Sequence, residues 1–116
     1  MEVSMPSVIS EVIIPLQTSV GPGGRFQSQE FDVSGTQSIS VNVSITNVNP
    51  TIKRTIFFGP SPNGGFQPAR VDAFQTSNHL LTSLPTHGPK MFVVVENTGL
   101  TAMNCDGWLY GVRLVP

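Results

Sequence analysis

The chain has 116 residues, the size of one ordinary domain, and only 11% of them are charged, against about 25% in an average soluble domain. Six Lys and Arg residues against seven Asp and Glu residues give a net charge of −1, which excludes a basic nucleic-acid footprint, a polybasic membrane patch and an acidic tail. The apolar share of 39% can form a core, and we expect residues 1–116 to form a single domain. No apolar helix-forming run approaches the roughly 20 residues needed to cross a bilayer.

Neutral polar residues take the place of the missing charge: 12 Ser, 10 Thr, 7 Asn and 6 Gln. Ser, Thr and Asn side chains compete with a helix for backbone hydrogen bonds, and 11 Gly and 10 Pro interrupt the chain, so the composition predicts an all-β protein. A surface with so few ions lacks the charge that keeps monomers apart. We therefore expect its faces to be occupied by neighbours in an oligomer, filament or shell; the alternative is a lightly charged module of extracellular type.

The first segments in chain order give short strands. Residues 1–7 have neither a basic region nor an apolar stretch, so we expect no secretory signal. The first predicted strand covers residues 8–14 and is expected to end at Pro15. After a turn at 19–24, the second predicted strand covers residues 26–33.

The clearest strand covers residues 38–46. Four β-branched residues alternate without error with four neutral polar residues: Ile39, Val41, Val43 and Ile45 against Ser40, Asn42, Ser44 and Thr46. A period of two over this length predicts a half-buried strand with one face on a core. Its polar face carries no charge.

The next strand, residues 51–58, ends in the pair Phe57 and Phe58. Neighbouring strand residues point to opposite faces, so we expect one of the two to leave the main core and to fill an end of the sandwich or meet another subunit. Further strands are predicted at residues 69–74, 79–84, 90–96 and 107–115. The 90–96 run, KMFVVVE, is typical of a strand covered on both faces.

Seven or eight short strands separated by turn signals predict a sandwich or a barrel. We favour an antiparallel two-sheet β-sandwich of jelly-roll type over a closed barrel.

Two stretches of the chain resemble small bacterial and phage β-sandwich proteins. One is Phe31-Asp32-Val33-Ser34-Gly35 before the long alternating strand, and the other runs from Gly88-Pro89-Lys90-Met91 through Val93 and Glu96-Asn97-Thr98-Gly99 to Tyr110-Gly111. The resemblance implies a small structural or adhesin-like module, often multimeric, and supplies no catalytic residue.

The titratable residues predict no catalytic, metal or cofactor site. Asp32 and Asp106 precede glycine-containing turns and are expected to bond nearby backbone. His79, His87 and Cys105 do not match any zinc-binding spacing. The spacing leaves a Cys–His nucleophilic pair open, but no motif surrounds Cys105, and the neighbouring Asp106 would raise the pKa of its thiol. We expect a buried, unreactive cysteine.

The aromatic residues allow two interpretations. Trp108 and Tyr110 lie on one face of a strand, about 7 Å apart, where an exposed pair could stack on sugar rings with Arg113 among the nearby polar groups. We favour burial in the core, because Val112 and Leu114 continue the stripe and aromatic side chains dominate cores. Phe66 lies in a loop rich in Gly and Pro and is expected to be a contact residue.

Together these observations predict a non-enzymatic building block that associates with copies of itself or with other structural subunits, as a virion decoration, fibre or surface component. The candidate interaction residues are Phe66, Phe57, Trp108, Tyr110 and Arg113. The alternative is a carbohydrate-binding module or lectin with a glycan partner. The sequence leaves the location unknown; without a signal peptide, a virion or a cell surface would have to be reached by another route.

Overall fold

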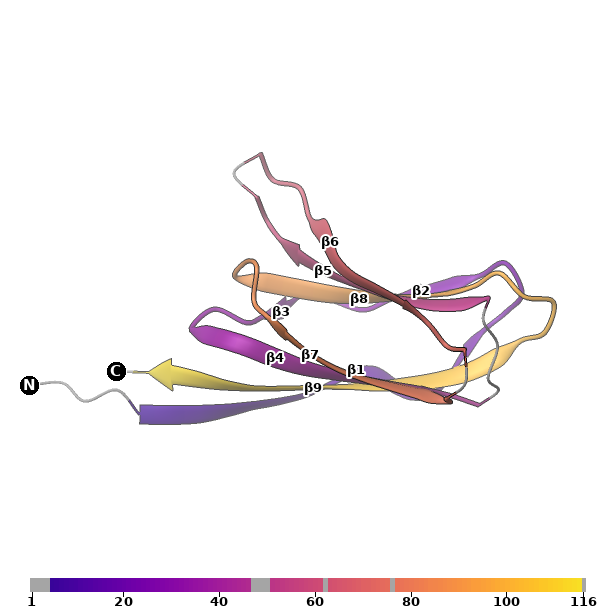
Figure 1. Cartoon of the computed structure of the whole chain (residues 1–116), viewed down its shortest axis with the longest axis horizontal. Coiled ribbons are helices and arrows are strands. Elements are labelled where there is room, and N and C mark those ends of the chain that lie inside the picture. The colour runs from indigo at the N-terminus through magenta and orange to yellow at the C-terminus, as the bar shows by residue number, and fades with distance from the viewer. Residues whose placement is uncertain (1–4, 47–50, 62, 76, 116) are drawn as a thin grey trace, which may run out of the picture.

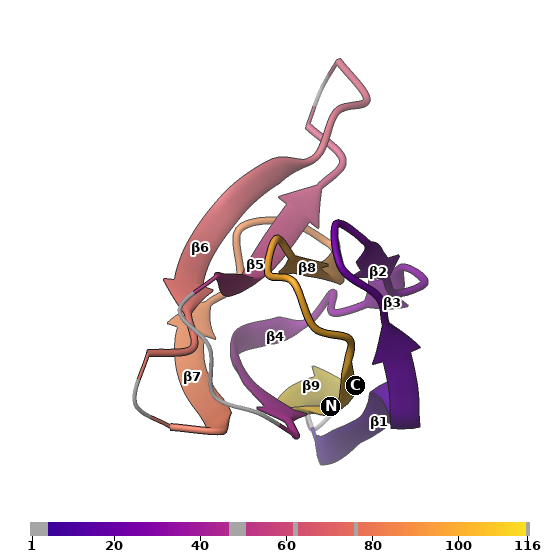
Figure 2. The same ribbon diagram turned by 90° about the vertical axis from the view of Figure 1, so that its right-hand side faces the viewer.

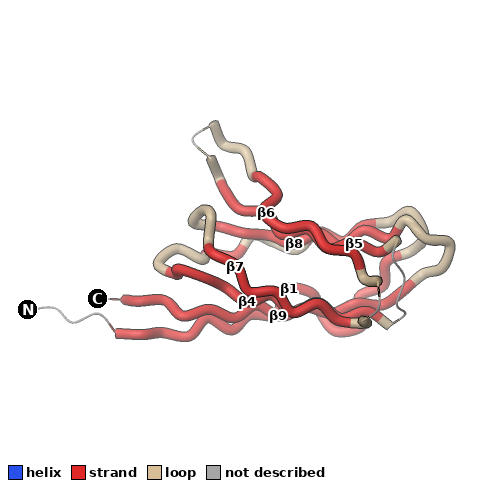
Figure 3. The backbone as a smooth tube through the Cα atoms, in the orientation of Figure 1, coloured by secondary structure: helices blue, strands red, loops and turns tan. Residues whose placement is uncertain are grey.

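A computed structural model describes residues 5–46, 51–61, 63–75 and 77–115, with backbone alone at residues 5, 114 and 115. These residues form nine β-strands joined by loops (Figure 3). Their bounds are β1 Met5–Val20, β2 Arg25–Gln27, β3 Phe31–Asp32, β4 Thr36–Ile45, β5 Ile52–Gly59, β6 Gln67–Ala73, β7 His79–Pro85, β8 Lys90–Asn97 and β9 Met103–Val115. No helix in these ranges is long and apolar enough to cross a membrane.

The strands form two antiparallel sheets packed face to face (Figures 1 and 2). One sheet has the order β1-β9-β4-β7, and the other has the order β2-β8-β5-β6 with β3 also paired to β8. Leaving out β3, this interleaving of early and late strands is the order of a jelly roll. The predicted two-sheet sandwich is confirmed.

The described residues contain nine strands, one more than the upper expectation of eight. The extra strand arises because the predicted strand at 26–33 is divided into β2 and β3. Ser28 lies at the division. Its backbone NH donates to the Val93 carbonyl, and its hydroxyl oxygen accepts from the Val93 NH, both at 2.9 Å. A side chain thus replaces the backbone acceptor, and the ladder of hydrogen bonds between main chains is interrupted there.

Strand β4 supplies the centre of the core, as its sequence predicts. Ile39, Val41, Val43 and Ile45 are all at most 4% exposed. Burying branched side chains contributes about 1.5–3 kcal/mol each, and a shift of one residue would turn them all to the opposite face. The alternation therefore fixes the register of β4 with both of its neighbours, β9 and β7.

Strand β8 is covered on both faces only at its middle, so the prediction for residues 90–96 is confirmed in part; Lys90 and Glu96 are exposed. Val93 and Val95 point into the sandwich and are fully buried. Val94 points outward but is only 1% exposed, since it lies between Thr55 of β5 and Gln27 of β2.

Strand β1 is longer than predicted, because it continues past Pro15. Its register with β9 shifts between Ile14 and Thr18, where Gln17 has a φ of 62° and the Thr18 hydroxyl donates to the Pro15 carbonyl at 2.7 Å. Within the described ranges β1 pairs with β9 alone, so it is an edge strand. Proline is tolerated at edges and bulges, where no ladder hydrogen bond is required of it.

An ion pair lies inside the sandwich at the β5–β6 edge. Arg54 is completely buried and donates to the carboxylate of Asp72, which also accepts from Arg70 Nε at 2.9 Å. Burial lowers the pKa of Arg54, and the Asp72 charge opposes that effect. The pair is needed because an uncompensated charge in this place would be far costlier than the pair itself.

Replacing Val43 by Asp should abolish cooperative folding. Val43 is 0% exposed, and an unpaired carboxylate there would cost several kcal/mol, comparable with the total stability of about 5–15 kcal/mol of a small domain. Circular dichroism during thermal unfolding measures this. Ser44→Asp, on the outward side of the same strand, is the control and should keep the transition; a normal transition for Val43→Asp would contradict the assignment of the core.

Replacing Asp72 by Asn should lower the free energy of unfolding by about 3–5 kcal/mol, because it leaves the buried Arg54 charge uncompensated. Urea denaturation measures the loss. Arg70→Gln is the control, since Arg70 is 53% exposed and its exposed ion pair should contribute at most about 1 kcal/mol. Equal losses for the two variants would show that Arg54 does not depend on Asp72.

Candidate interaction surface

The outer face of the β1-β9-β4-β7 sheet is almost free of charge. We call it the neutral face, and it consists of the outward positions of four strands. They include Val8, Ser10 and Val12 on β1; Asp106, Trp108, Tyr110 and Val112 on β9; Ser38, Ser40, Asn42 and Ser44 on β4; and His79, Leu81, Ser83 and Pro85 on β7. Asp106 is the one residue among them with a formal charge at neutral pH.

Large apolar side chains on the neutral face are open to solvent. Val8 is 73% exposed, Leu81 66% and Val112 56%, and Val12, Trp108 and Tyr110 are also exposed. Single exposed apolar residues are common, but six of them on one sheet face favour an interaction site.

A row of hydroxyl groups crosses the middle of the neutral face. Tyr110 pairs with Ser10 on one side and with Ser40 on the other, and Ser40 Oγ lies 2.7 Å from Ser83 Oγ. Trp108 is attached to this row, because its Nε1 donates to Ser10 Oγ at 3.0 Å and its ring lies 6.0 Å from that of Tyr110. The indole is therefore held in place while much of its ring stays open.

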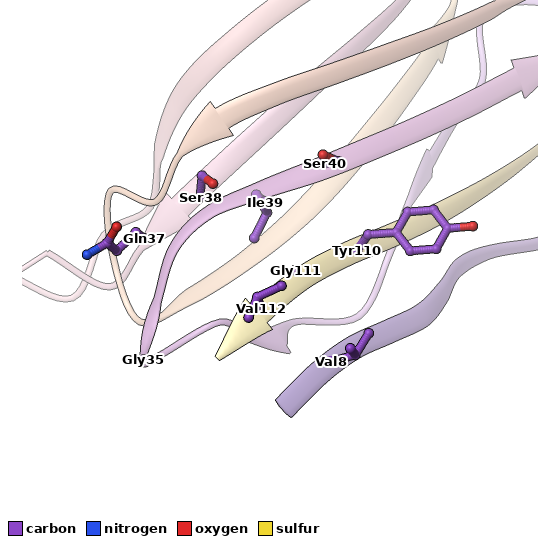
Figure 4. A pocket seen from close by; sticks show the side chains of 9 residues that line it. All are labelled: Val8, Gly35, Gln37, Ser38, Ile39, Ser40, Tyr110, Gly111 and Val112. Atoms are coloured by element: carbon purple, nitrogen blue, oxygen red, sulfur yellow. The ribbon is translucent and has the colours of Figure 1, made fainter. Parts of the chain in front are cut away.

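A shallow hollow of about 510 Å³ lies at one end of the neutral face (Figure 4). Its lining has no formally charged side chain and combines apolar, hydroxyl and amide groups: Val8, Gly35, Gln37, Ser38, Ile39, Ser40, Tyr110, Gly111 and Val112. Such a surface can accept apolar groups and neutral hydrogen-bonding groups.

The predicted burial of Trp108, Tyr110 and Val112 is wrong. These three side chains alternate with the completely buried Leu109 and point outward. The side chain of Leu114, the fourth member of the predicted stripe, lies outside the described residues. The predicted period of two is present in β9, but its larger side chains lie on the outward face.

The reason lies in the glycines of β9. Gly107 and Gly111 occupy inward positions, next to isoleucine side chains that need the space. A Cβ atom on Gly107 would lie 3.0 Å from Ile14 Cδ1, and one on Gly111 would lie 3.4 Å from Ile39 Cγ2. A side chain at position 107 would therefore have to displace Ile14, whereas a Cβ atom at position 111 would make an ordinary contact. The tight packing at Gly107 favours the orientation in which Trp108 and Tyr110 face outward.

The two aspartates that were expected in turns differ. Asp32 accepts from the backbone NH of Ser34 at 2.9 Å and from its hydroxyl at 2.6 Å, which confirms the turn, and these bonds lower the pKa of Asp32. Asp106 was predicted wrongly, because it lies within β9 opposite Ser44. Strand β9 begins at Met103, earlier than predicted, since its first residues continue the pairing with β1.

The outer face of the other sheet differs in charge. We call it the charged face, because Arg25, Lys53, Lys90 and Glu96 occupy its outward positions. Val71, 56% exposed, is its one large exposed apolar residue within the described ranges. This face is therefore suited to water.

The aromatic residues of the charged face cover one another. Phe58 is buried and Phe57 points outward, which confirms that one of the two leaves the core. Phe57 stacks on Phe92 with ring centroids 4.7 Å apart, and Phe66 lies 5.1 Å from Phe92. Phe57 and Phe66 are thus half-buried in a cluster within the chain, and their role in contacts with other molecules stays a prediction.

Arg113 does not share a face with Trp108 and Tyr110. It points to the other side of β9, where its Nη2 donates to the Asp32 carbonyl at 2.7 Å and lies 3.7 Å from the Asp32 carboxylate. The suggested grouping of Arg113 with the two rings is therefore wrong, because neighbouring positions of the strand face opposite ways.

The thiol of Cys105 is buried, as expected. Burial and the neighbouring Asp106 raise its pKa to about 11, which opposes formation of the nucleophilic thiolate. His79 and His87 lie on the exposed surface, at the start of β7 and in the β7–β8 loop. Among the described residues, no three His, Cys, Asp or Glu side chains are grouped to hold a metal ion.

Comparisons with known proteins support the fold. No family model matches the chain, and no curated protein matches it. Among solved structures, the chain is similar to a pilus protein of Bacillus endospore appendages, with TM-score 0.54 and 10% identity over 98% of this chain and 88% of the other. The SPBc2 prophage-derived protein YomS matches with TM-score 0.57 and 12% identity over 95% of this chain and 98% of the other.

The VP2 subviral particle protein of infectious bursal disease virus also matches, with TM-score 0.57 and 15% identity. The match covers 94% of this chain but 33% of the viral chain. At these identities the likeness shows a shared fold, which agrees with the resemblance to bacterial and phage β-sandwich proteins.

Cys105 should react very slowly with iodoacetamide at pH 8 in the folded protein. With a pKa of about 11, only about one thiol in a thousand is ionised at that pH, and the side chain is buried. Mass spectrometry of the labelled chain measures the rate. The same protein in concentrated urea is the control and should label rapidly, whereas equal rates in both conditions would show that the thiol is accessible.

Proposed function

We propose that this protein is a non-enzymatic structural subunit that associates with copies of itself or with other structural subunits in a larger assembly. A virion decoration, a fibre or a surface component has these properties. The observation that carries the proposal is the neutral face, where exposed Val8, Leu81, Trp108 and Tyr110 lie among uncharged hydroxyl and amide groups. Sheet faces that stay in water usually carry charge.

Two further findings support the structural role. Proteins of similar fold include a pilus component and a viral particle protein, so the sandwich is compatible with assembly. The thiol of Cys105, the strongest nucleophile in the sequence, has a pKa of about 11 and is buried, which does not suit covalent catalysis.

A carbohydrate-binding module is the second candidate, and one observation favours it. Trp108 and Tyr110 are exposed rather than buried, next to the neutral hydrogen-bonding side chains of Asn42 and Ser40. Exposed aromatic rings beside such groups can stack on the apolar faces of sugars. This candidate uses the same surface as assembly, so one set of measurements separates the two.

Light scattering should give a mass above the 12.5 kDa of one chain, increasing with protein concentration. Because the proposed contact is apolar and neutral, the mass should not decrease from low to high salt, whereas a contact between ions would be screened. A mass of 12.5 kDa at every concentration and salt level would overturn self-association. If that monomer bound to a glycan array and the variant Trp108→Ala did not, the carbohydrate candidate would replace it.

A further inference from the structure

We infer that the neutral face packs against the neutral face of a second copy about a two-fold axis, so that association closes at a dimer. This inference rests on the proposed structural role and names a second copy of the chain as the first partner in the assembly. Two sheets can pack face to face at about 10 Å, as the two sheets of this molecule already do.

The charge of the surface permits this arrangement. In a two-fold contact the same patch is used by both copies, so a charged patch would repel itself. Asp106 is the one formally charged residue of the neutral face, and it is half-buried at the end opposite the hollow beside Tyr110. The centre, formed by Trp108, Tyr110 and Ser40, meets its copy without repulsion between like charges.

The rest of the described surface offers a weaker apolar group. The charged face carries Arg25, Lys53, Lys90 and Glu96 together with one large exposed apolar residue, Val71. The rings of Phe57, Phe66 and Phe92 on that face are half-buried against one another. Two other large apolar residues are exposed outside both faces. Leu16 lies in β1 beyond Pro15, and Leu100 lies in the β8–β9 connection. Head-to-tail growth needs two different complementary patches, so the neutral face is its own best partner.

The size of the face sets the strength of the contact. Four strands spaced about 4.8 Å apart, each contributing about seven residues of about 3.3 Å, give roughly 450 Å² of flat area. Side-chain relief and the remaining length of β1 and β9 increase this value toward the roughly 800 Å² that each partner buries in a standard interface. We therefore expect a dimer whose population changes over an accessible concentration range, with Trp108 and Tyr110 at its centre.

A matched pair of variants tests the inference. Val112 on the neutral face and Val71 on the charged face are both valines in strands, and both are 56% exposed. In sedimentation velocity over a range of concentrations, the unmodified chain should reach a plateau at twice 12.5 kDa. Val112→Lys should weaken dimerisation at least about tenfold, because each copy buries a charge in an apolar contact, and Val71→Lys should leave it unchanged.

Circular dichroism during thermal unfolding is the folding control for this comparison. Both variants should unfold in the same transition as the unmodified chain. If Val112→Lys were misfolded, Leu81→Lys would take its place, because Leu81 is a separate exposed residue of the neutral face. A mass that rises past the dimer without a plateau would overturn closure at two copies and leave the structural role standing. Loss of dimer in Val71→Lys but not in Val112→Lys would overturn the assigned face. A monomer at all concentrations would overturn the dimer and restrict the structural role to association with other subunits.

Discussion

The packing of isoleucine side chains against the glycines of β9 supports the outward orientation of the rings on which the proposed interaction face depends. Ile14 and Ile39 occupy the space inside the sandwich next to Gly107 and Gly111. Because Ile14 leaves no room for a side chain at position 107 without moving, this packing favours the orientation in which the rings of Trp108 and Tyr110 lie on the outer surface. The neutral face and the proposed assembly depend on that orientation.

The sequence predicted the features that depend on local pattern. The error-free alternation in β4 identified its buried side chains, and the apolar run of β8 identified a strand whose middle, at Val93, Val94 and Val95, is buried on both faces. The sandwich followed from the spacing of strands and turns. These predictions succeeded because side-chain period and burial are coupled within one strand.

Features that depend on partners distant in sequence were not predictable in the same way. The outward orientation of Trp108 is accompanied by the packing of Ile14, far away in the chain, against the neighbouring Gly107. The Arg54–Asp72 pair joins two strands whose pairing no local pattern reveals, and Pro15 lies inside a strand only because β1 is at an edge. The low charge of the chain suggested an occupied surface, but the division into a neutral and a charged face needed the register of every strand.

The burial of Cys105 has a practical consequence. Since the single native sulfhydryl is shielded and hardly ionised, a cysteine introduced at an outward position becomes the one site that takes a fluorophore or spin label under mild conditions. Distances between labelled copies can then be measured in solution without first removing the natural residue, so the native core stays intact throughout such work.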